Sequence, residues 1–244
     1  MPSTRLLPGL ALALLLAVPA LAAPAAPAAA TDPLADLGRD FWAWRAVHQP
    51  LSGDDIPRIE RPAGWVPDWS KATVAARREA LAGFETRWRA LDAAAWPVPR
   101  QVDWRLLGSA IARVRWELDY ERGFRRDPNF YIEQTLGAVF DRLLQPPPFD
   151  RARGEEIVRR MEAIPAVLYD APGNLDQAVA PFARPAVGQL GGVRSEVNAA
   201  VAAVDPLLPP DLAHRLDIAA QPAIKALESY RDWLRGRLPG FPEK

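Results

Sequence analysis

The sequence of 244 residues contains no cysteine. This absence excludes a cysteine nucleophile, a zinc site built on thiolates, an iron–sulfur cluster and any disulfide bond. A chain of this length can bury an apolar core that is large enough to fold without covalent cross-links. We therefore expect its stability to come from packing between secondary-structure elements.

Histidine is also scarce, because the sequence contains only His48 and His214. Zinc hydrolases of the zincin type place two histidines one helical turn apart with a glutamate between them, and these two histidines lack that spacing. His214 and Asp217 form a weak candidate metal pair on a predicted helix, for which an ordinary surface contact is the simpler interpretation. The sequence therefore predicts no catalytic residue, no metal ligand and no cofactor in this chain.

An excess of positive charge is the third absence, since 30 basic residues balance 30 acidic ones. Without bulk positive charge, a protein has no electrostatic basis for holding nucleic acid or an anionic membrane. We expect neither as a partner of the mature protein. The sequence also contains no P-loop, no G-x-G-x-x-G motif and no G-x-S-x-G elbow, so it gives no sign of a nucleotide site or of an α/β-hydrolase serine.

Residues 1–22 have the three parts of a secretory signal peptide. Arg5 provides the positive n-region, residues 6–18 are mainly apolar, and Ala20–Ala22 supplies the small residues that a signal peptidase reads. The apolar run is shorter than the ~20 residues that a membrane-spanning helix needs. We therefore expect cleavage before Ala23 and export of the mature protein to the periplasm or the medium.

The rest of the chain has the pattern of a single all-α domain. After an Ala/Pro-rich spacer at residues 23–31, residues 32–244 show apolar positions at helical spacing, interrupted by proline clusters, and no segment alternates as a strand does. The pattern predicts about seven helices in an irregular array. Their predicted start signals are Asp32, Ser70, Asp103, Asp127, Asp150, Pro185 and Asp211.

A long loop is predicted between the first two helices, over residues 50–69. It contains four prolines and two glycines, and its length makes a functional role plausible. Trp65 and Trp69 lie in this loop. They are candidate ligand-contact residues that would stack on a sugar or grip a peptide. Alternatively, they pin the loop onto the helices beneath it.

Arg113, Glu117 and Glu121 follow one another at i,i+4 steps on a predicted helix. Two carboxylates on one helix face could serve general acid–base chemistry or a di-metal site. A di-iron bundle also needs Glu-x-x-His motifs, which the sequence lacks. A solvated face with arginine–carboxylate pairs is therefore the simpler interpretation. Glu155 and Glu156 stand in the first turn of another predicted helix, where they complement the helix dipole.

Four short motifs resemble a known bacterial family. In chain order they are Arg126–Ile132, Leu136–Phe140, Glu162–Pro165 and Tyr230–Leu234. Each motif is moderately specific, and their order and spacing together resemble the N-terminal half of the bacterial "domain of unknown function 885" family. The resemblance extends from Phe41 to Leu238, which is nearly the whole mature chain.

Members of this family are typically longer, and they resemble helical zinc metallopeptidases with a His-Glu-x-x-Pro-Gly-His-type motif beyond the point where this chain stops. No residue of this chain matches that motif. The resemblance therefore implies zinc only in full-length relatives, and a peptide substrate only together with the missing C-terminal half. We expect the N-terminal helical region of an exported metallopeptidase-like protein, without catalysis of its own.

The sequence leaves two other hypotheses open. The chain is alternatively a complete extracytoplasmic helical binding module, whose contact surface would be the Trp/Pro-rich loop with Trp65 and Trp69. A third interpretation is a fragment or a prematurely stopped gene product.

The signal peptide predicts a defined N-terminus for the exported protein. N-terminal sequencing of protein recovered from the periplasm or the medium should begin at Ala23. Leu14→Arg should leave the uncleaved chain inside the cell, because export requires an uninterrupted apolar region. An exported protein that still begins at Met1 would indicate an uncleaved anchor instead.

Overall fold

The computed structural model describes residues 32–52, 60–146 and 148–244. The predicted signal peptide, residues 1–22, and the predicted spacer, residues 23–31, lie outside the described residues. Within the described ranges the secondary structure is helical and contains no strand, which confirms the all-α prediction. None of the helices in these ranges is long and apolar enough to cross a membrane.

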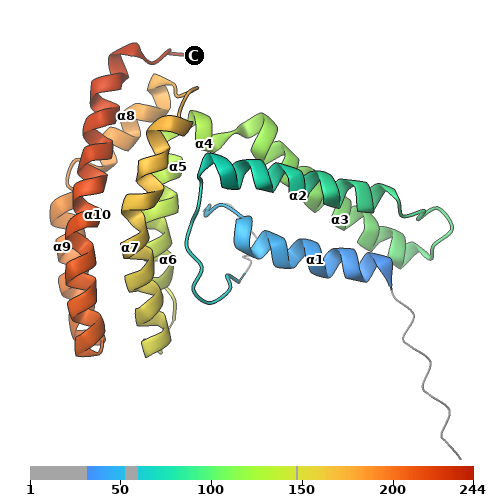
Figure 1. Ribbon diagram of the computed structural model, residues 1–244, viewed down its shortest axis with the longest axis horizontal. Helices are drawn as coiled ribbons and strands as arrows, with labels where there is room; N and C mark the ends of the chain where they lie inside the picture. Colours follow the sequence, from blue (N-terminus) through green and yellow to red (C-terminus); the bar gives the residue numbers. More distant parts are fainter. Residues whose placement is uncertain (1–31, 53–59, 147) are drawn as a thin grey trace, which may run out of the picture. The chain divides into compact units, whose positions relative to one another are not determined.

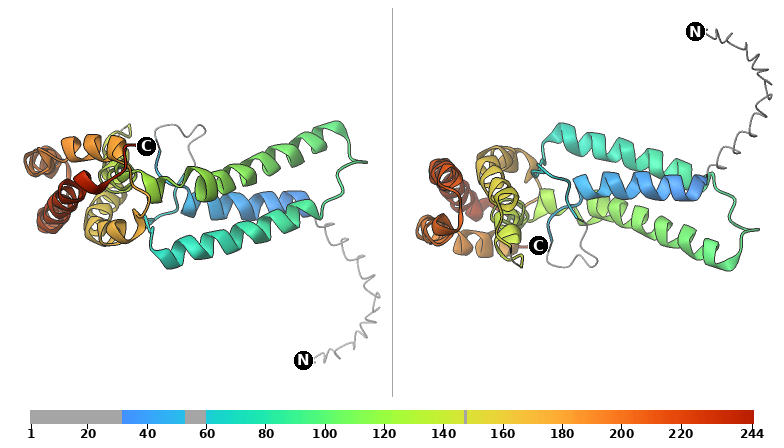
Figure 2. Two further views of the ribbon diagram at one scale, coloured as in Figure 1. Left: turned by 90° about the horizontal axis from the view of Figure 1, so that it is seen from above. Right: turned by 90° about the horizontal axis from the view of Figure 1, so that it is seen from below.

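The first group of helices consists of α1 (Pro33–His48), α2 (Lys71–Arg89) and α3 (Val98–Trp116), which lie side by side in all the ribbon views (Figures 1 and 2). The carboxylate of Asp32 caps α1 and the hydroxyl of Ser70 caps α2, as their sequence positions predict. Each helix contributes a buried apolar side chain to the shared core, for example Phe41, Leu81 and Ile111. The π-helical segment η1 (Glu117–Glu121) continues α3.

The second group begins with a short helix and then a contiguous run, namely α4 (Gly123–Arg126), α5 (Pro128–Ile132), the π-helical segment η2 (Glu133–Gly137) and α6 (Ala138–Leu143). It continues with α7 (Arg151–Asn174), α8 (Ala180–Gln189), α9 (Val193–Val204), the 3-10 turn η3 (Asp205–Leu207), α10 (Pro210–Arg237) and the 3-10 turn η4 (Leu238–Gly240). Helices α7 and α10 pack along each other (Figure 1). With contiguous segments counted once and the single turn α4 left aside, the described residues form eight helices, close to the seven predicted.

Some helix boundaries differ from the prediction. The helix expected from about Pro185 to Val204 is two helices, α8 and α9, and α8 already begins at Ala180. The chain turns between them because the Gly191 N–H donates to the Gly188 carbonyl oxygen at 3.0 Å, which closes a tight turn. Glycine favours such a break, since its backbone adopts non-helical conformations at little cost.

Two buried tyrosines give the motif Arg126–Ile132 a structural role. The Tyr131 hydroxyl donates to the Phe124 carbonyl oxygen at 2.9 Å. The Tyr230 hydroxyl, from α10, donates to the Pro128 carbonyl oxygen at 2.9 Å. Burial raises the pKa of both phenols above its usual value, so both remain donors at any ordinary pH. The Tyr230 bond joins α10 to α5, and the Tyr131 bond joins α5 to α4.

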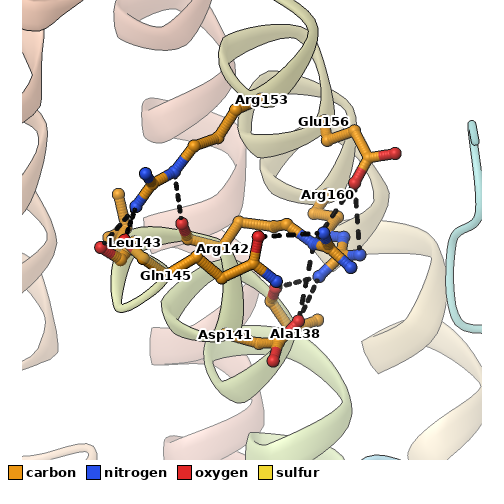
Figure 3. Close-up of polar contacts among 8 residues, drawn as sticks. All are labelled: Ala138, Asp141, Arg142, Leu143, Gln145, Arg153, Glu156 and Arg160. Atoms are coloured by element: carbon orange, nitrogen blue, oxygen red, sulfur yellow. Dashed lines mark hydrogen bonds and ion pairs between the residues drawn. The ribbon is translucent and has the colours of Figure 1, made fainter. Parts of the chain in front are cut away.

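Arg153 closes the C-terminal end of α6. Its guanidinium donates to the carbonyl oxygens of Arg142, Leu143 and Gln145 at 2.8, 2.9 and 2.7 Å (Figure 3). The last carbonyl groups of a helix have no partner within the helix. One arginine therefore satisfies groups that would otherwise need water or a glycine cap.

A close contact between α2 and α3 depends on a glycine. The indoles of Trp88 and Trp104 stack with ring centroids 4.6 Å apart, and each indole N–H donates to the other residue's main-chain carbonyl oxygen. Gly108 lies directly against the Trp88 ring, so a Cβ atom at this position would overlap the indole.

Gly108→Ala should therefore destabilise the fold. We expect a loss of about 1–3 kcal/mol in the free energy of unfolding, the usual cost of overpacking. Gly83→Ala in α2 is the matched control, because nothing lies within 4 Å of its added methyl group, and it should gain about 0.5–1 kcal/mol from helix propensity. Urea unfolding followed by circular dichroism measures both; equal midpoints for the two variants would contradict the packing described here.

Candidate functional site

The chain after residue 60 is fastened to the C-terminal end of α1. The Arg61 guanidinium donates to the carbonyl oxygens of Ala46 and Pro50 at 3.1 and 3.2 Å. The Trp65 indole N–H donates to the Val47 carbonyl oxygen at 2.7 Å, and the Arg61 guanidinium stacks over the same indole. These groups fix the described part of the proline-rich loop against the first helix.

Trp65 and Trp69 are both buried, with 8% and 4% of their surface exposed. The Trp69 ring packs against Phe124 and Phe130 with centroid distances of 5.7 and 4.5 Å, and its carbonyl oxygen accepts a 2.7 Å hydrogen bond from the Asn174 side chain. Both tryptophans thus pin the loop onto the helices. Trp69 also lines the cavity described next, so ligand contact there stays a prediction.

The Arg77 cavity is a cleft of about 560 Å³ between the two groups of helices. Its walls come from the end of α1, from Pro50–Ser52, from α2, from the end of α3 with η1, and from the chain around α5. Aromatic side chains in the walls include Trp44, Trp69 and Phe130. Its charged lining consists of Arg45, Arg77, Arg113, Glu117, Glu121, Asp127 and Glu133.

A buried ion pair forms one wall of this cavity. The Arg45 guanidinium donates to both carboxylate oxygens of Glu117, at 2.6 and 2.7 Å, and both side chains are at least 90% buried. Arg113 adds a third hydrogen bond to Glu117 at 3.2 Å. The predicted solvated face is therefore wrong for Glu117, because the Arg45 side chain on α1, 72 positions away in sequence, covers it. A bidentate pair of this kind is strong and geometrically specific.

Arg77 and His48 lie together in the same cavity. Arg77 Nε donates to His48 Nδ1 at 3.3 Å, and Arg77 Nη2 donates to the Asp68 carbonyl oxygen at 2.6 Å. Burial and the positive charge of Arg77 lower the pKa of His48 to about 4. His48 is therefore neutral at pH 7, and because Nδ1 accepts a hydrogen bond, its proton is on Nε2. Burial also lowers the pKa of Arg77 to about 10, so Arg77 remains charged.

The cavity coincides with the irregular backbone of the fold. The π-helical segment η1 contributes Glu117 and Glu121, and η2 contributes Glu133. Arg122, just after η1, adopts a left-handed conformation with φ of 53°. π-helical turns and left-handed non-glycine residues are both enriched at functional sites. Sequence periodicity cannot reveal a π turn, so the sequence predicted neither feature.

A second cleft, the Gln145 cavity of about 640 Å³, adjoins the first. The two cavities share Pro50–Ser52 and Glu133 as lining residues. The buried side-chain amide of Gln134 fixes their common wall, since it donates to the Leu51 carbonyl oxygen and accepts from the Leu51 N–H, each at 2.9 Å. These two hydrogen bonds tie the shared wall to η2.

Asp141, Arg142 and Gln145 line the Gln145 cavity, and Figure 3 shows the polar contacts around them. Behind them lies Arg160, of which only 2% is exposed. Its guanidinium donates to the Ala138 carbonyl oxygen at 2.7 Å and to the Asp141 carboxylate at 3.2 Å. These bonds hold the helix α6 against α7, and they show that this buried arginine has carboxylate partners.

The other residues singled out in the sequence lie elsewhere. His214 and Asp217 are exposed on α10. Glu155 pairs with Arg151 on the surface at 3.1 Å, whereas Glu156 faces Arg142 and belongs to the polar network beside α6. Across residues 32–52, 60–146 and 148–244, no three histidine or acidic side chains are grouped closely enough to hold a metal ion.

Comparisons with known proteins place the chain in a family. The model of a family described as "Bacterial protein of unknown function (DUF885)" matches residues 53–241. No protein with a curated description matches the sequence. The chain is similar in fold to the solved structure of a candidate lipoprotein of unknown function from Shewanella oneidensis, with a TM-score of 0.66 and 17% sequence identity. The similarity covers 85% of this chain and 37% of that protein.

The lowered pKa of His48 predicts a pH-dependent stability. The unfolded chain protonates His48 near pH 6.5, its ordinary value, whereas the folded protein does so near pH 4. The unfolded state therefore binds more protons in this window, and the free energy of unfolding should fall as the pH falls from 6.5 towards 4.

This dependence can be measured with urea unfolding at pH 7 and pH 5. The difference between the two pH values should be smaller in His48→Gln than in the wild-type protein. An NMR titration, with the His48 signal identified by its loss in the variant, should show His48 mostly neutral at pH 5. A midpoint at pH 6 or above would contradict the burial of this side chain.

Proposed function

Because the chain belongs to the bacterial DUF885 family of proteins of unknown function, we propose that it works as the N-terminal helical region of an exported, metallopeptidase-like protein. In this role its helices form one wall of a cleft that holds a peptide. The observation that carries the proposal is the pair of adjoining cavities, of about 560 and 640 Å³, that share the wall Pro50–Ser52.

The dimensions and lining of the two cavities suit an extended peptide. Each has the volume of a typical small-ligand site, and together they give room for several residues in a row. Aromatic side chains such as Trp44 and Phe130 offer apolar surface, and Arg77 and Glu133 offer charged groups for the peptide's polar atoms. The wall between the cavities is held by Gln134, so peptide binding would require little ordering of the protein.

Catalysis belongs to another part of the longer protein in this proposal. The zinc motif of metallopeptidase-like relatives has no counterpart among the residues of this chain, and the similar lipoprotein structure is much longer than the matched region. The description of that protein as a candidate lipoprotein is in keeping with export. This chain has no cysteine to carry a lipid, so its own export would rest on the signal peptide alone.

A second candidate function is a complete binding module that acts without further catalytic domains. The position of Trp69 at the Arg77 cavity favours it. Trp65, in contrast, is buried against α1 and lines neither of the two cavities. The contact surface of such a module would therefore be the Arg77 cavity, not the exposed side of the loop.

The proposal predicts binding without hydrolysis. Purified protein beginning at Ala23 should bind the reduced, carboxymethylated insulin B chain in a calorimetric titration, and mass spectrometry should find this peptide intact after incubation with zinc. Ser52→Trp should abolish the heat of binding by filling the shared wall of both cavities, whereas Ser109→Trp, on the exposed face of α3, should leave it unchanged. Zinc-dependent cleavage by this chain, or binding that Ser52→Trp does not affect, would overturn the proposal.

A further inference from the structure

Arg77 differs from the other buried arginines of the described chain in its partners. Arg45 has the Glu117 carboxylate, and Arg160 has Asp141. Arg77 is 96% buried, since 4% of its surface is exposed, yet its hydrogen bonds go only to the neutral His48 ring and to a main-chain carbonyl oxygen. Its Nη1 atom is buried and makes no hydrogen bond.

An unpaired donor on a buried cation is costly. Leaving a buried donor without a hydrogen-bond acceptor is unfavourable, and more so when the group is charged. The guanidinium gains some stabilisation from the Trp69 ring, which lies 4.0 Å beneath it. A ring face does not replace a hydrogen-bond acceptor, however. The Asp68 carboxylate acts on Arg77 through its charge alone, because its oxygens accept hydrogen bonds from the Thr73 hydroxyl and the Ser70 N–H.

The position of Arg77 explains why this cost is tolerated. The residue lines the Arg77 cavity, so a negatively charged group that enters the cavity can supply both the acceptor and the counter-charge. Nη1 is closed to solvent in this structure, and pairing therefore requires a small movement of the side chains around it. Neutral His48, with its proton on Nε2, is a second donor in the same wall.

The rest of the lining selects the kind of anion. Four carboxylates surround the cavity against three arginines, namely Glu117, Glu121, Asp127 and Glu133 against Arg45, Arg77 and Arg113. One of the arginines, Arg45, is already committed to Glu117. A doubly charged anion such as phosphate would be repelled by this lining. A single carboxylate, particularly one that belongs to a molecule with a positive amino group, matches it.

We propose that Arg77 binds the carboxylate of a zwitterionic ligand, either the C-terminus of a short peptide or a free amino acid, within the Arg77 cavity. The inference rests on the proposed function in taking a peptide as the physiological source of this carboxylate. It adds the end of the peptide that is recognised, the residue that recognises it and the direction in which the peptide lies in the cleft.

The test compares four probes on the purified mature protein, namely trialanine, trialanine amide, alanine and inorganic phosphate. Calorimetry and the NMR signals of the His48 ring report binding. Trialanine should bind and shift the His48 signals, and trialanine amide should bind about tenfold to a hundredfold more weakly, because one charge-assisted hydrogen bond is lost. Binding of alanine as strong as that of trialanine would assign the site to a free amino acid, and weaker binding would assign it to a peptide end.

Arg77→Met should weaken trialanine binding by the same factor as the amide. Arg78→Met is the matched control, because the neighbouring guanidinium bonds Asp119 and the Leu118 carbonyl oxygen and does not line the cavity. Its affinity for trialanine should stay that of the wild type. If circular dichroism shows that Arg77→Met does not fold, Arg77→Lys keeps the charge without the planar donors and should also lose about tenfold.

Three results with the small probes would overturn this inference. They are equal binding of trialanine and its amide, no shift of the His48 signals by trialanine, and tighter binding of phosphate than of trialanine. The proposed function fails separately, through the insulin B chain. If the insulin B chain binds equally well to the wild type and to Arg77→Met, the proposed peptide-binding function is retained and the carboxylate site at Arg77 is rejected.

Discussion

The carbonyl groups at the C-terminal end of α1 set the constraint on which the site depends. The last carbonyls of a helix have no partner within it, and here Arg61 and Trp65 supply donors for them from the far side of a long loop. This attachment determines where the chain re-enters the fold at Trp69. It thereby positions the start of α2, and with it Arg77, opposite the end of α1. Distant side chains thus complete the capping of the helix end that lines the cavity.

The two buried arginines of the site, Arg45 and Arg77, are stabilised in different ways. Arg45 and Glu117 are removed from water together, and the loss of hydration is offset by two short hydrogen bonds. Arg77 is buried with neutral partners and an aromatic ring. The first arrangement is complete within the chain and stabilises the joint between α1 and η1. The second leaves one donor of the Arg77 guanidinium without an acceptor, in a residue that lines the cavity.

Patterns within a few residues of each other in the sequence predicted most of the helices, but they did not predict the site. Capping residues such as Asp32, Ser70 and Asp150 mark real helix starts, because a cap depends on neighbours within three positions. The Arg77 cavity joins α1, α2, η1 and η2, and nothing in the local pattern indicates that these segments meet. The interpretation of Glu117 as a solvated residue was wrong for the same reason. The family motif Arg126–Ile132 did point to the right region, although its described contacts are structural.

The π-helical segment η2 between α5 and α6 makes the orientation of α6 depend on the number of residues in this run. A π turn accommodates one more residue than an α-helical turn, and an α-helix advances by about 100° per residue, so the residues of α6 are rotated by roughly that angle relative to an uninterrupted helix. Asp141 and Arg142 reach the Gln145 cavity on this rotated surface. A single inserted codon in an ancestral helix is enough to turn a surface in this way. The site can therefore differ between relatives by the presence or absence of one residue, while every side chain type in the helix is retained.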